Sequence, residues 1–206
     1  MGGAAPVKVE NIEMIKEDIE AIYSLSPMQQ AFLVHKLYAG KSELGFLQAS
    51  GVLRGDLNVM AFRQAWQRIV DRHPVLRTSF FWDDLDEPLQ VVHRQVKLTW
   101  AQQDWRGLSP VKRQERLESF LHADRGQGFD LSEAPLTRLA LMQVAEDTYH
   151  FVWSFHHVIM DGWSVSLLLK EIFEFYDAFC QGRELHLERP RPYGDYIAWL
   201  RQQDLS

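Results

Sequence analysis

The sequence predicts a mixed α/β fold in which helices cover a β-sheet. Two observations lead to this class. Segments with helical apolar spacing alternate along the chain with segments of two-residue alternation, and two of the strand-like segments are joined by a turn short enough for antiparallel pairing. With 206 residues, 46% of them hydrophobic, the chain is long and apolar enough to bury the core of one compact domain.

The first helix is predicted from its start signal. Ser26 fits the N-cap position, Pro27 the first helical position, and Gln29 the capping-box partner three residues after the cap. This helix is expected to run to about Ala39. The acidic stretch at 10–22 before it is predicted to be a lead-in helix.

The remaining elements follow from the same reasoning. Apolar positions keep helical spacing at 59–72, and Pro74 ends that helix. Aromatic residues alternate with other side chains at 148–155, which is typical of a strand. The predicted elements are, in chain order, a strand at 46–54, a helix at 59–72, strands at 76–81 and 89–100, a helix at 111–124, a hairpin of strands at 136–145 and 148–155, and helices at 164–180 and 193–203.

Composition excludes several classes of protein. A net charge of −6 argues against a nucleic-acid partner. No apolar run approaches the roughly 20 residues that span a bilayer, so no membrane partner is expected. Cys180 is the only cysteine, in an apolar helical run where a buried structural role is expected. Because one thiol cannot form an internal disulfide, a reducing, cytoplasmic location is predicted.

The segment FHHVIMDGWS at 155–164 holds the candidate chemistry. Neighbouring strand residues point to opposite faces, so one of His156 and His157 can be structural while the other faces a cleft. Gly162 is free to take a positive φ in a tight turn, and Ser164 is placed to cap the following helix.

Three chemical interpretations of this segment compete, beside the plain one that a histidine at a strand end is a buried structural residue. A metal site is weakly supported, because no His-x3-His pair is present and Cys180 is remote in sequence. A serine hydrolase would need a Gly-x-Ser-x-Gly turn, which is absent. Attack of an amine or alcohol on a thioester needs only one neutral imidazole and a means to stabilise an oxyanion.

A family resemblance favours the third interpretation. Residues 24–30 (SLSPMQQ) look like the first core motif of nonribosomal peptide synthetase condensation domains. Residues 72–80 match the second motif, RHxxLRTxF, at every fixed position, and residues 156–164 match the third, HHxxxDGWS. Residues 129–136 and 193–200 resemble stretches found between and after these motifs.

The resemblance implies an architecture and partners. The fold would be a chloramphenicol-acetyltransferase-like lobe, and a full domain has two such lobes with the active site in a tunnel between them. We expect residues 1–22 to be a lead-in segment whose first residues resemble a cloning remnant. Residues 23–206 would be the N-terminal lobe, with the C-terminal lobe absent. Donor and acceptor would arrive on the phosphopantetheine arms of peptidyl carrier proteins, with no cofactor or metal bound directly.

The resemblance also implies residue roles. His157 is the functional histidine, as a base or as a group that orients the amine, and Gly162 lies near the oxyanion. His156 and Asp161 support the site, and Asp161 is expected to pair with an arginine of the second motif, for which Arg72 and Arg77 are the candidates. This lobe alone is expected to be inactive, because half of the tunnel wall is missing.

Rival functions remain open. A cyclising subtype would carry a DxxxxD pattern, and an epimerase would usually continue with Val-Ser-Trp, so GWS at 162–164 favours condensation. A carrier-dependent or free-standing O-acyltransferase shares the third motif. A non-catalytic docking module would keep the histidines without using them.

Overall fold

The computed structural model describes residues 18–39 and 44–203. The elements are, in chain order, β1 (Ile19–Ser24), α2 (Pro27–Ala39), β2 (Phe46–Arg54), α3 (Val59–Arg72), the 3-10 helix η1 (Pro74–Arg77), β3 (Thr78–Phe81), β4 (Leu89–His93), β5 (Thr99–Asp104), α4 (Pro110–Gln127), β6 (Thr137–Ala145), β7 (Thr148–His156), α5 (Gly162–Cys180) and α6 (Tyr193–Gln202).

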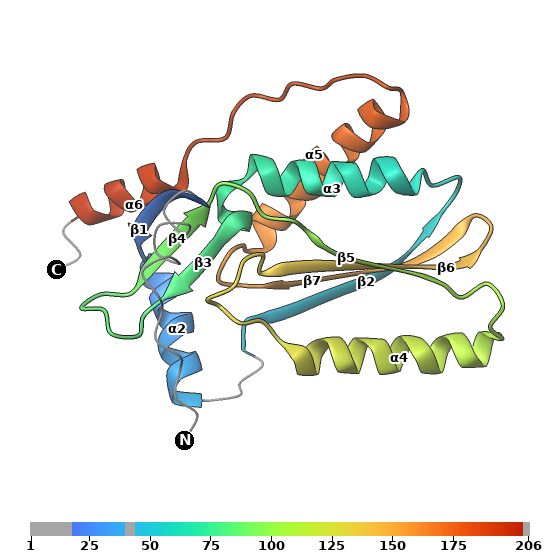
Figure 1. Ribbon diagram of the computed structural model, residues 1–206, viewed down its shortest axis with the longest axis horizontal. Coiled ribbons are helices and arrows are strands. Elements are labelled where there is room, and N and C mark those ends of the chain that lie inside the picture. Colours follow the sequence, from blue (N-terminus) through green and yellow to red (C-terminus); the bar gives the residue numbers. More distant parts are fainter. Residues whose placement is uncertain (1–17, 40–43, 204–206) are drawn as a thin grey trace.

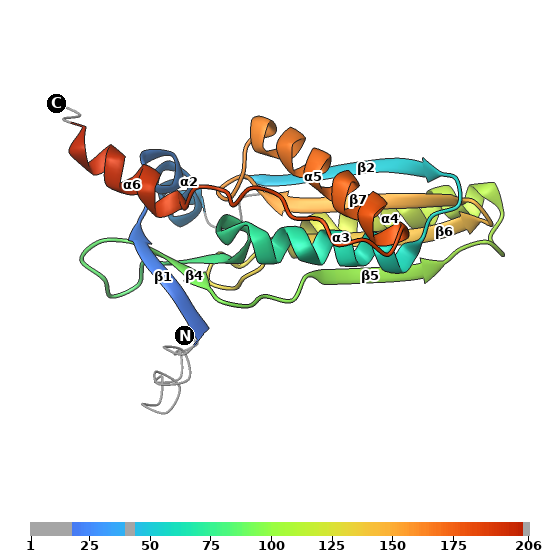
Figure 2. The ribbon, with the colours of Figure 1, turned by 90° about the horizontal axis from the view of Figure 1, so that it is seen from above.

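The strands form two sheets. The larger sheet has the order β2-β7-β6-β5, with antiparallel pairs except for the parallel pair of β5 and β6. The smaller, antiparallel sheet has the order β1-β4-β3. Helix α4 covers one face of the larger sheet, whereas α3 and α5 cover the other (Figures 1 and 2). The predicted class, a mixed sheet covered by helices, is confirmed.

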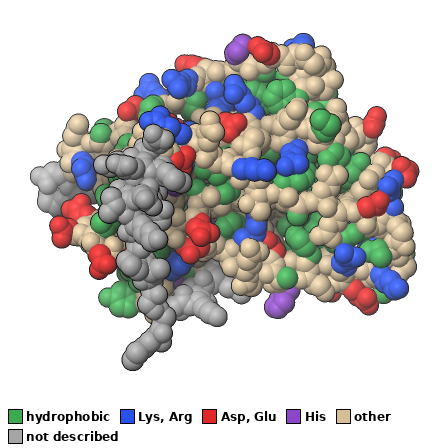
Figure 3. Space-filling model, viewed as in Figure 1, with side chains coloured by type: hydrophobic (Ala, Val, Ile, Leu, Met, Phe, Trp, Pro, Cys, Tyr) green, Lys and Arg blue, Asp and Glu red, His purple; other side chains and the backbone are tan. Residues whose placement is uncertain are grey.

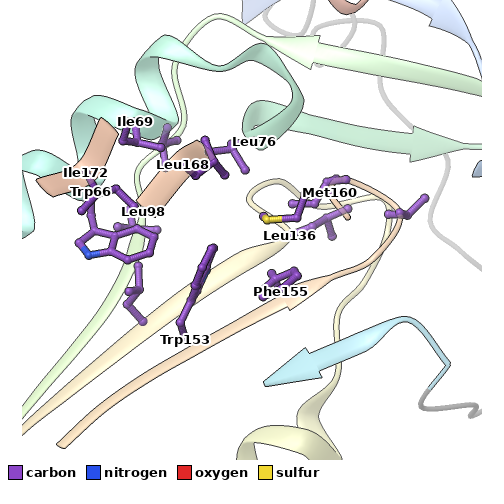
Figure 4. Packing of buried hydrophobic residues seen from close by; sticks show 14 of the residues in the cluster. Trp66, Ile69, Leu76, Leu98, Leu136, Trp153, Phe155, Met160, Leu168 and Ile172 are labelled. Atoms are coloured by element: carbon purple, nitrogen blue, oxygen red, sulfur yellow. The ribbon is translucent and has the colours of Figure 1, made fainter. Parts of the chain in front are cut away.

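The core lies between α3, α5 and the larger sheet (Figure 4). Helix α3 begins at an Asn58 cap, whose side chain accepts from Ala61 N, and it turns one apolar face inward. On that face the Trp66 ring packs 4.9 Å from the Trp153 ring of β7, centroid to centroid. The buried residues of this face are Ala61, Phe62, Ala65, Trp66, Ile69 and Val70. Strand β7, which leads into the candidate site, is thus held by large aromatic contacts.

Several predicted elements are confirmed at their bounds. The strand at 46–54 and the helix at 59–72 coincide with β2 and α3, and the predicted hairpin corresponds to β6 and β7. The capping box of α2 forms as expected, since Gln29 N donates to Ser26 Oγ at 3.3 Å and Ser26 N donates to Gln29 Oε1 at 2.9 Å. Among the described residues, no helix is long and apolar enough to cross a membrane.

The prediction of a lead-in helix at 10–22 is wrong for the part of this range that the structure describes. Residues 10–17 lie outside the described residues, and Ile19–Ser24 form strand β1. This strand pairs antiparallel with β4, and the Glu20 carboxylate accepts from Arg77 Nη1 at 2.7 Å. Acidic residues that favour a helix locally are here recruited into a strand by partners distant in the sequence.

The single strand predicted at 89–100 is two strands in different sheets, β4 and β5. Gln67 of α3 explains the break. Its Nε2 donates to Val96 O and its Oε1 accepts from Leu98 N, both at 2.9 Å, so the backbone between the strands is bonded to a helix rather than to a strand. The strand predicted at 76–81 begins only at Thr78, because Pro74 starts the 3-10 helix η1.

Helix α5 differs from its prediction in two ways. It begins at Gly162 rather than Ser164, and its cap is Asp161. Cys180, expected to be buried, is exposed at its last position. The buried positions of α5, which fall on one helical face, are Leu168, Ile172, Phe175 and Ala178.

Figure 3 shows the molecule from the side of Figure 1 as a space-filling surface. Several basic side chains lie close together in the upper left part of this view, and elsewhere on the face basic and acidic side chains are interspersed. The prediction of no nucleic-acid partner rests on the net charge alone and stays a prediction.

Candidate active site

His157 follows the last residue of β7, and one bond sets its tautomer. Its Nδ1 lies 2.7 Å from Met160 O. Because a carbonyl oxygen can only accept, Nδ1 carries the proton and donates it. Nε2 of a neutral imidazole is then an acceptor, and among the bonds of the described residues it takes none. A partly buried imidazole held in this way can accept a proton from a substrate.

His156 occupies a different environment, as strand alternation predicts. It is buried, and Val158 N donates to its Nδ1 at 3.1 Å, so the ring proton lies on Nε2. Burial lowers the pKa of His156 to about 4, assisted by the positive charge of Lys36. Its imidazole is therefore neutral near pH 7 and supports the loop that carries His157.

Gly45 allows the chain to approach both histidines. It has a φ of +86°, which favours glycine, and its carbonyl accepts from His157 N at 2.6 Å. A Cβ at this position would lie 2.5 Å from Cε1 of His156. The residue before β2 therefore fixes the end of β7 only because it has no side chain.

A cavity of about 420 Å³ surrounds His157. Its walls come from the start of α2, from η1, from the loop and first turn of α5, and from α6. The lining residues are Ser26, Met28, Gln29, Val75, His157, Val158, Ile159, Met160, Asp161, Ser164, Tyr193 and Tyr196. A larger hollow between α3 and 94–97 shares no residue with it.

Sequence reasoning misses three of the residues that line this cavity. Spacing marks Gln29 only as a helix-start residue, yet its Nε2 lies within 3.5 Å of Val158 O in the histidine loop. Tyr193 and Tyr196 stand out only as members of the family-like stretch at 193–200. The sequence offers one signal for them, which is that their stretch follows the third motif. The long segment between that motif and α6 gives no indication that they lie near His157.

Asp161 does not pair with Arg72 or Arg77, so the predicted ion pair is wrong. Its Oδ1 accepts from Ser164 N at 2.8 Å and from Ser164 Oγ at 2.7 Å, which makes it the N-cap of α5. These bonds from Ser164 lower the pKa of the Asp161 carboxyl. Gly162, the first residue of α5, does not have the positive φ expected of it.

The two arginines have other partners. Arg72 Nε donates to Glu171 Oε2 of α5 at 2.9 Å, and the His73 ring lies 2.7 Å from the same oxygen. Arg77 Nε donates to Val70 O at 3.1 Å, and its Nη1 reaches Glu20. Arg72 thus ties α3 to α5, whereas Arg77 ties α3 to the smaller sheet. Both arginines connect the elements that surround the site, and neither contacts Asp161.

Two substitutions at Asp161 can distinguish the contribution of its capping hydrogen bonds from that of its charge. Asp161→Ala is expected to lower the free energy of unfolding by about 1 kcal/mol, the usual cost of losing an N-cap side chain. Asp161→Asn should cost much less, because its amide oxygen can still accept from Ser164. Urea denaturation of both variants measures the difference. Equal losses in the two variants would show that charge, and not capping, is what Asp161 contributes.

The fold is that of a lobe of the chloramphenicol-acetyltransferase-like class. The starter condensation domain of rhizomide synthetase superposes with a TM-score of 0.79 at 21% identity, covering 91% of this chain and 46% of that one. The first condensation domain of the CDA synthetase gives a TM-score of 0.78 at 16% identity, covering 92% and 47%.

Sequence comparison identifies the family. The model of the condensation domain family matches residues 19–206, and the chain belongs to this family. One of the linear gramicidin synthase proteins of Brevibacillus parabrevis is 45% identical over 186 residues, which is 90% of this chain and 4% of that protein. Bacitracin synthase 3 of Bacillus licheniformis is 36% identical over 98% of this chain and 3% of its own length. The chain therefore spans a small part of these synthetases and just under half of a solved domain.

Proposed function

We propose that residues 23–206 form the N-terminal lobe of a peptide-bond-forming condensation domain. The reaction would transfer a donor acyl or peptidyl group from its thioester to the amine of an acceptor aminoacyl thioester. The observation that carries the proposal is the bond from His157 Nδ1 to Met160 O, which leaves Nε2 as the acceptor nitrogen. His157 sits in a cavity with Asp161, the cap residue of α5, at its wall.

The chemistry requires one proton transfer and one oxyanion. The acceptor nitrogen attacks the thioester carbonyl carbon, Nε2 of His157 takes the proton that this nitrogen loses, and the proton passes to the thiolate as the C–S bond breaks. Gly162 begins α5, and a helix N-terminus favours the negative charge that develops on the carbonyl oxygen. If His157 orients the amine instead of removing its proton, the same nitrogen accepts the bond.

The partners follow from this reaction. Donor and acceptor peptidyl carrier proteins would present their substrates on phosphopantetheine arms, and a C-terminal lobe would complete the walls around His157. Large apolar side chains near the cavity support the need for a second lobe. Met28 on α2 is 68% exposed and Trp163 on α5 is 85% exposed. No cofactor bound directly to the lobe enters the proposed steps.

A comparison of one lobe with two lobes tests the proposal. We expect no amide from this chain alone, and amide formation when the chain is joined to the C-terminal lobe of a relative such as the linear gramicidin synthase protein. Mass spectrometry of the product from donor and acceptor thioesters measures both. Amide formation by the chain alone that is lost in His157→Ala would refute its inactivity. Acylation of an alcohol but not of an amine would favour an O-acyltransferase.

A further inference from the structure

Helix α6 carries a row of aromatic rings that the proposed chemistry does not use. Tyr193, Tyr196 and Trp199 recur every three residues, so they lie along one side of the helix. The ring centroids of Tyr193 and Tyr196 are 5.5 Å apart, and those of Tyr196 and Trp199 are 6.1 Å apart at an interplanar angle of 21°. Tyr196 is 46% exposed and Trp199 is 53% exposed. The outer part of this row therefore presents aromatic surface to solvent.

The inner end of the row is fixed to the body of the lobe. Burial raises the pKa of the Tyr193 hydroxyl, and Tyr193 lines the cavity together with Ser26, the cap of α2. A Cβ at Gly194 would lie 2.4 Å from Cε1 of Tyr23 in β1, so only glycine allows this close approach. Ile197 is the buried residue of the helix. Helix α6 is thus anchored at Tyr193, Gly194 and Ile197, while the ring of Tyr196 stays partly exposed.

The row is continuous with the His157 cavity. Tyr193 and Tyr196 both line it, and Trp199 extends the row from Tyr196 outwards. The lining residues include no lysine or arginine, and Asp161 is their only acidic member. This wall therefore lacks a cationic side chain that would pair with a phosphate or carboxylate, whereas the aromatic rings suit a flat or branched apolar group.

We propose that Tyr196, backed by Trp199, binds the apolar side chain of the substrate thioester that reaches His157. Tyr196 is then a specificity-determining residue, and Tyr193 is a positioning residue that sets its place. This inference rests on the proposed function, because it takes the ligand to be an acyl or aminoacyl thioester. It deepens that function by naming the side-chain class, aromatic or branched aliphatic, that the lobe prefers.

Binding of two stable analogues to the 206-residue chain tests the inference. Phenylalanyl- and alanyl-pantetheine with an amide in place of the thioester differ only in the side chain that would meet Tyr196. Isothermal titration calorimetry should give a Kd roughly fivefold to tenfold lower for the phenylalanyl analogue, as expected for one aromatic contact. In Tyr196→Ala the two Kd values should converge, whereas Tyr196→Phe should keep the difference. Tyr38→Ala is the matched control, because Tyr38 is 90% exposed on α2 and does not line the cavity.

The outcomes separate this inference from the proposed function. His157→Ala should leave the ratio of Kd values unchanged, because the contact with Tyr196 does not need the imidazole. A ratio that is the same in the parent and in Tyr196→Ala overturns the inference, even if the complete domain forms amides through His157. If the ratio of Kd values depends on Tyr196 but the complete domain forms no amide, the proposed contact at Tyr196 is supported and the proposed amide-forming function is refuted. If neither analogue binds the chain, the test uses the complete domain and compares kcat/KM for the phenylalanyl and alanyl thioesters. A ratio of these kcat/KM values that is unchanged in Tyr196→Ala refutes the inference.

Discussion

Replacing His157 with alanine is expected to lower the rate of amide formation by a complete domain about 10²- to 10⁴-fold, the usual contribution of a positioned general base. The variant removes the nitrogen that would accept the proton of the attacking amine. It also removes the donor to Met160 O, but Met160 lines the same cavity as His157, so water that enters the space left by the ring can replace that donor. The rate is measured by single-turnover formation of the product from donor and acceptor thioesters.

Two controls separate chemistry from folding. His35→Ala removes an imidazole from the exposed face of α2 and should leave the rate unchanged. Thermal unfolding of His157→Ala should stay close to that of the parent, since the ring is only partly buried. If the His157→Ala domain forms amide at the parental rate, His157 is not catalytic. The interpretation of the motif as part of a non-catalytic docking module would then be favoured.

The parts of the fold that sequence predicts well are those with local causes. The cap of α2 is set within four residues, since Ser26 and Gln29 bond to each other. Helix α3 ends where Pro74 follows His73, and the β6–β7 hairpin turns within two residues. In each of these places the competing structure is excluded by residues that are neighbours in the chain, so composition and spacing suffice.

Some of the errors fall where the deciding partner is distant in sequence. Strand β1 exists because it pairs with β4, far along the chain, and Glu20 finds Arg77. The position of His157 at the end of a strand is predictable, but its neighbours on α6 are not, since α6 reaches the cavity only through tertiary packing on Tyr23. The error at Asp161 has the opposite cause, because the resemblance implies an ion pair with a distant arginine, whereas the carboxylate accepts hydrogen bonds from Ser164, three residues away.

Lowering the pH from 7 to 4 is expected to remove about 3 kcal/mol of the free energy of unfolding through His156 alone. Its pKa is about 4 in the folded chain, against 6.5 for an unperturbed histidine. Between these values the unfolded chain binds a proton that the folded chain does not, so stability falls as pH falls, by about 1.4 kcal/mol per pH unit. The contribution is complete above about pH 6.5 and lost near pH 4. Urea denaturation at steps between pH 7 and pH 4 measures it.

His156→Asn isolates the effect from the carboxylates that also titrate in this range. Asparagine is smaller than the buried ring, so the variant should be less stable at pH 7, although its side-chain oxygen can still accept from Val158 N. Because asparagine does not take up a proton in this range, the variant should lose less stability on acidification. The difference in unfolding free energy between parent and variant should shrink by about 3 kcal/mol from pH 7 to pH 4. His35→Asn is the matched control for loss of an exposed imidazole. Parallel curves for parent and His156→Asn would mean that the ring is not held neutral by burial, and the support that it gives to the His157 loop would then need another cause.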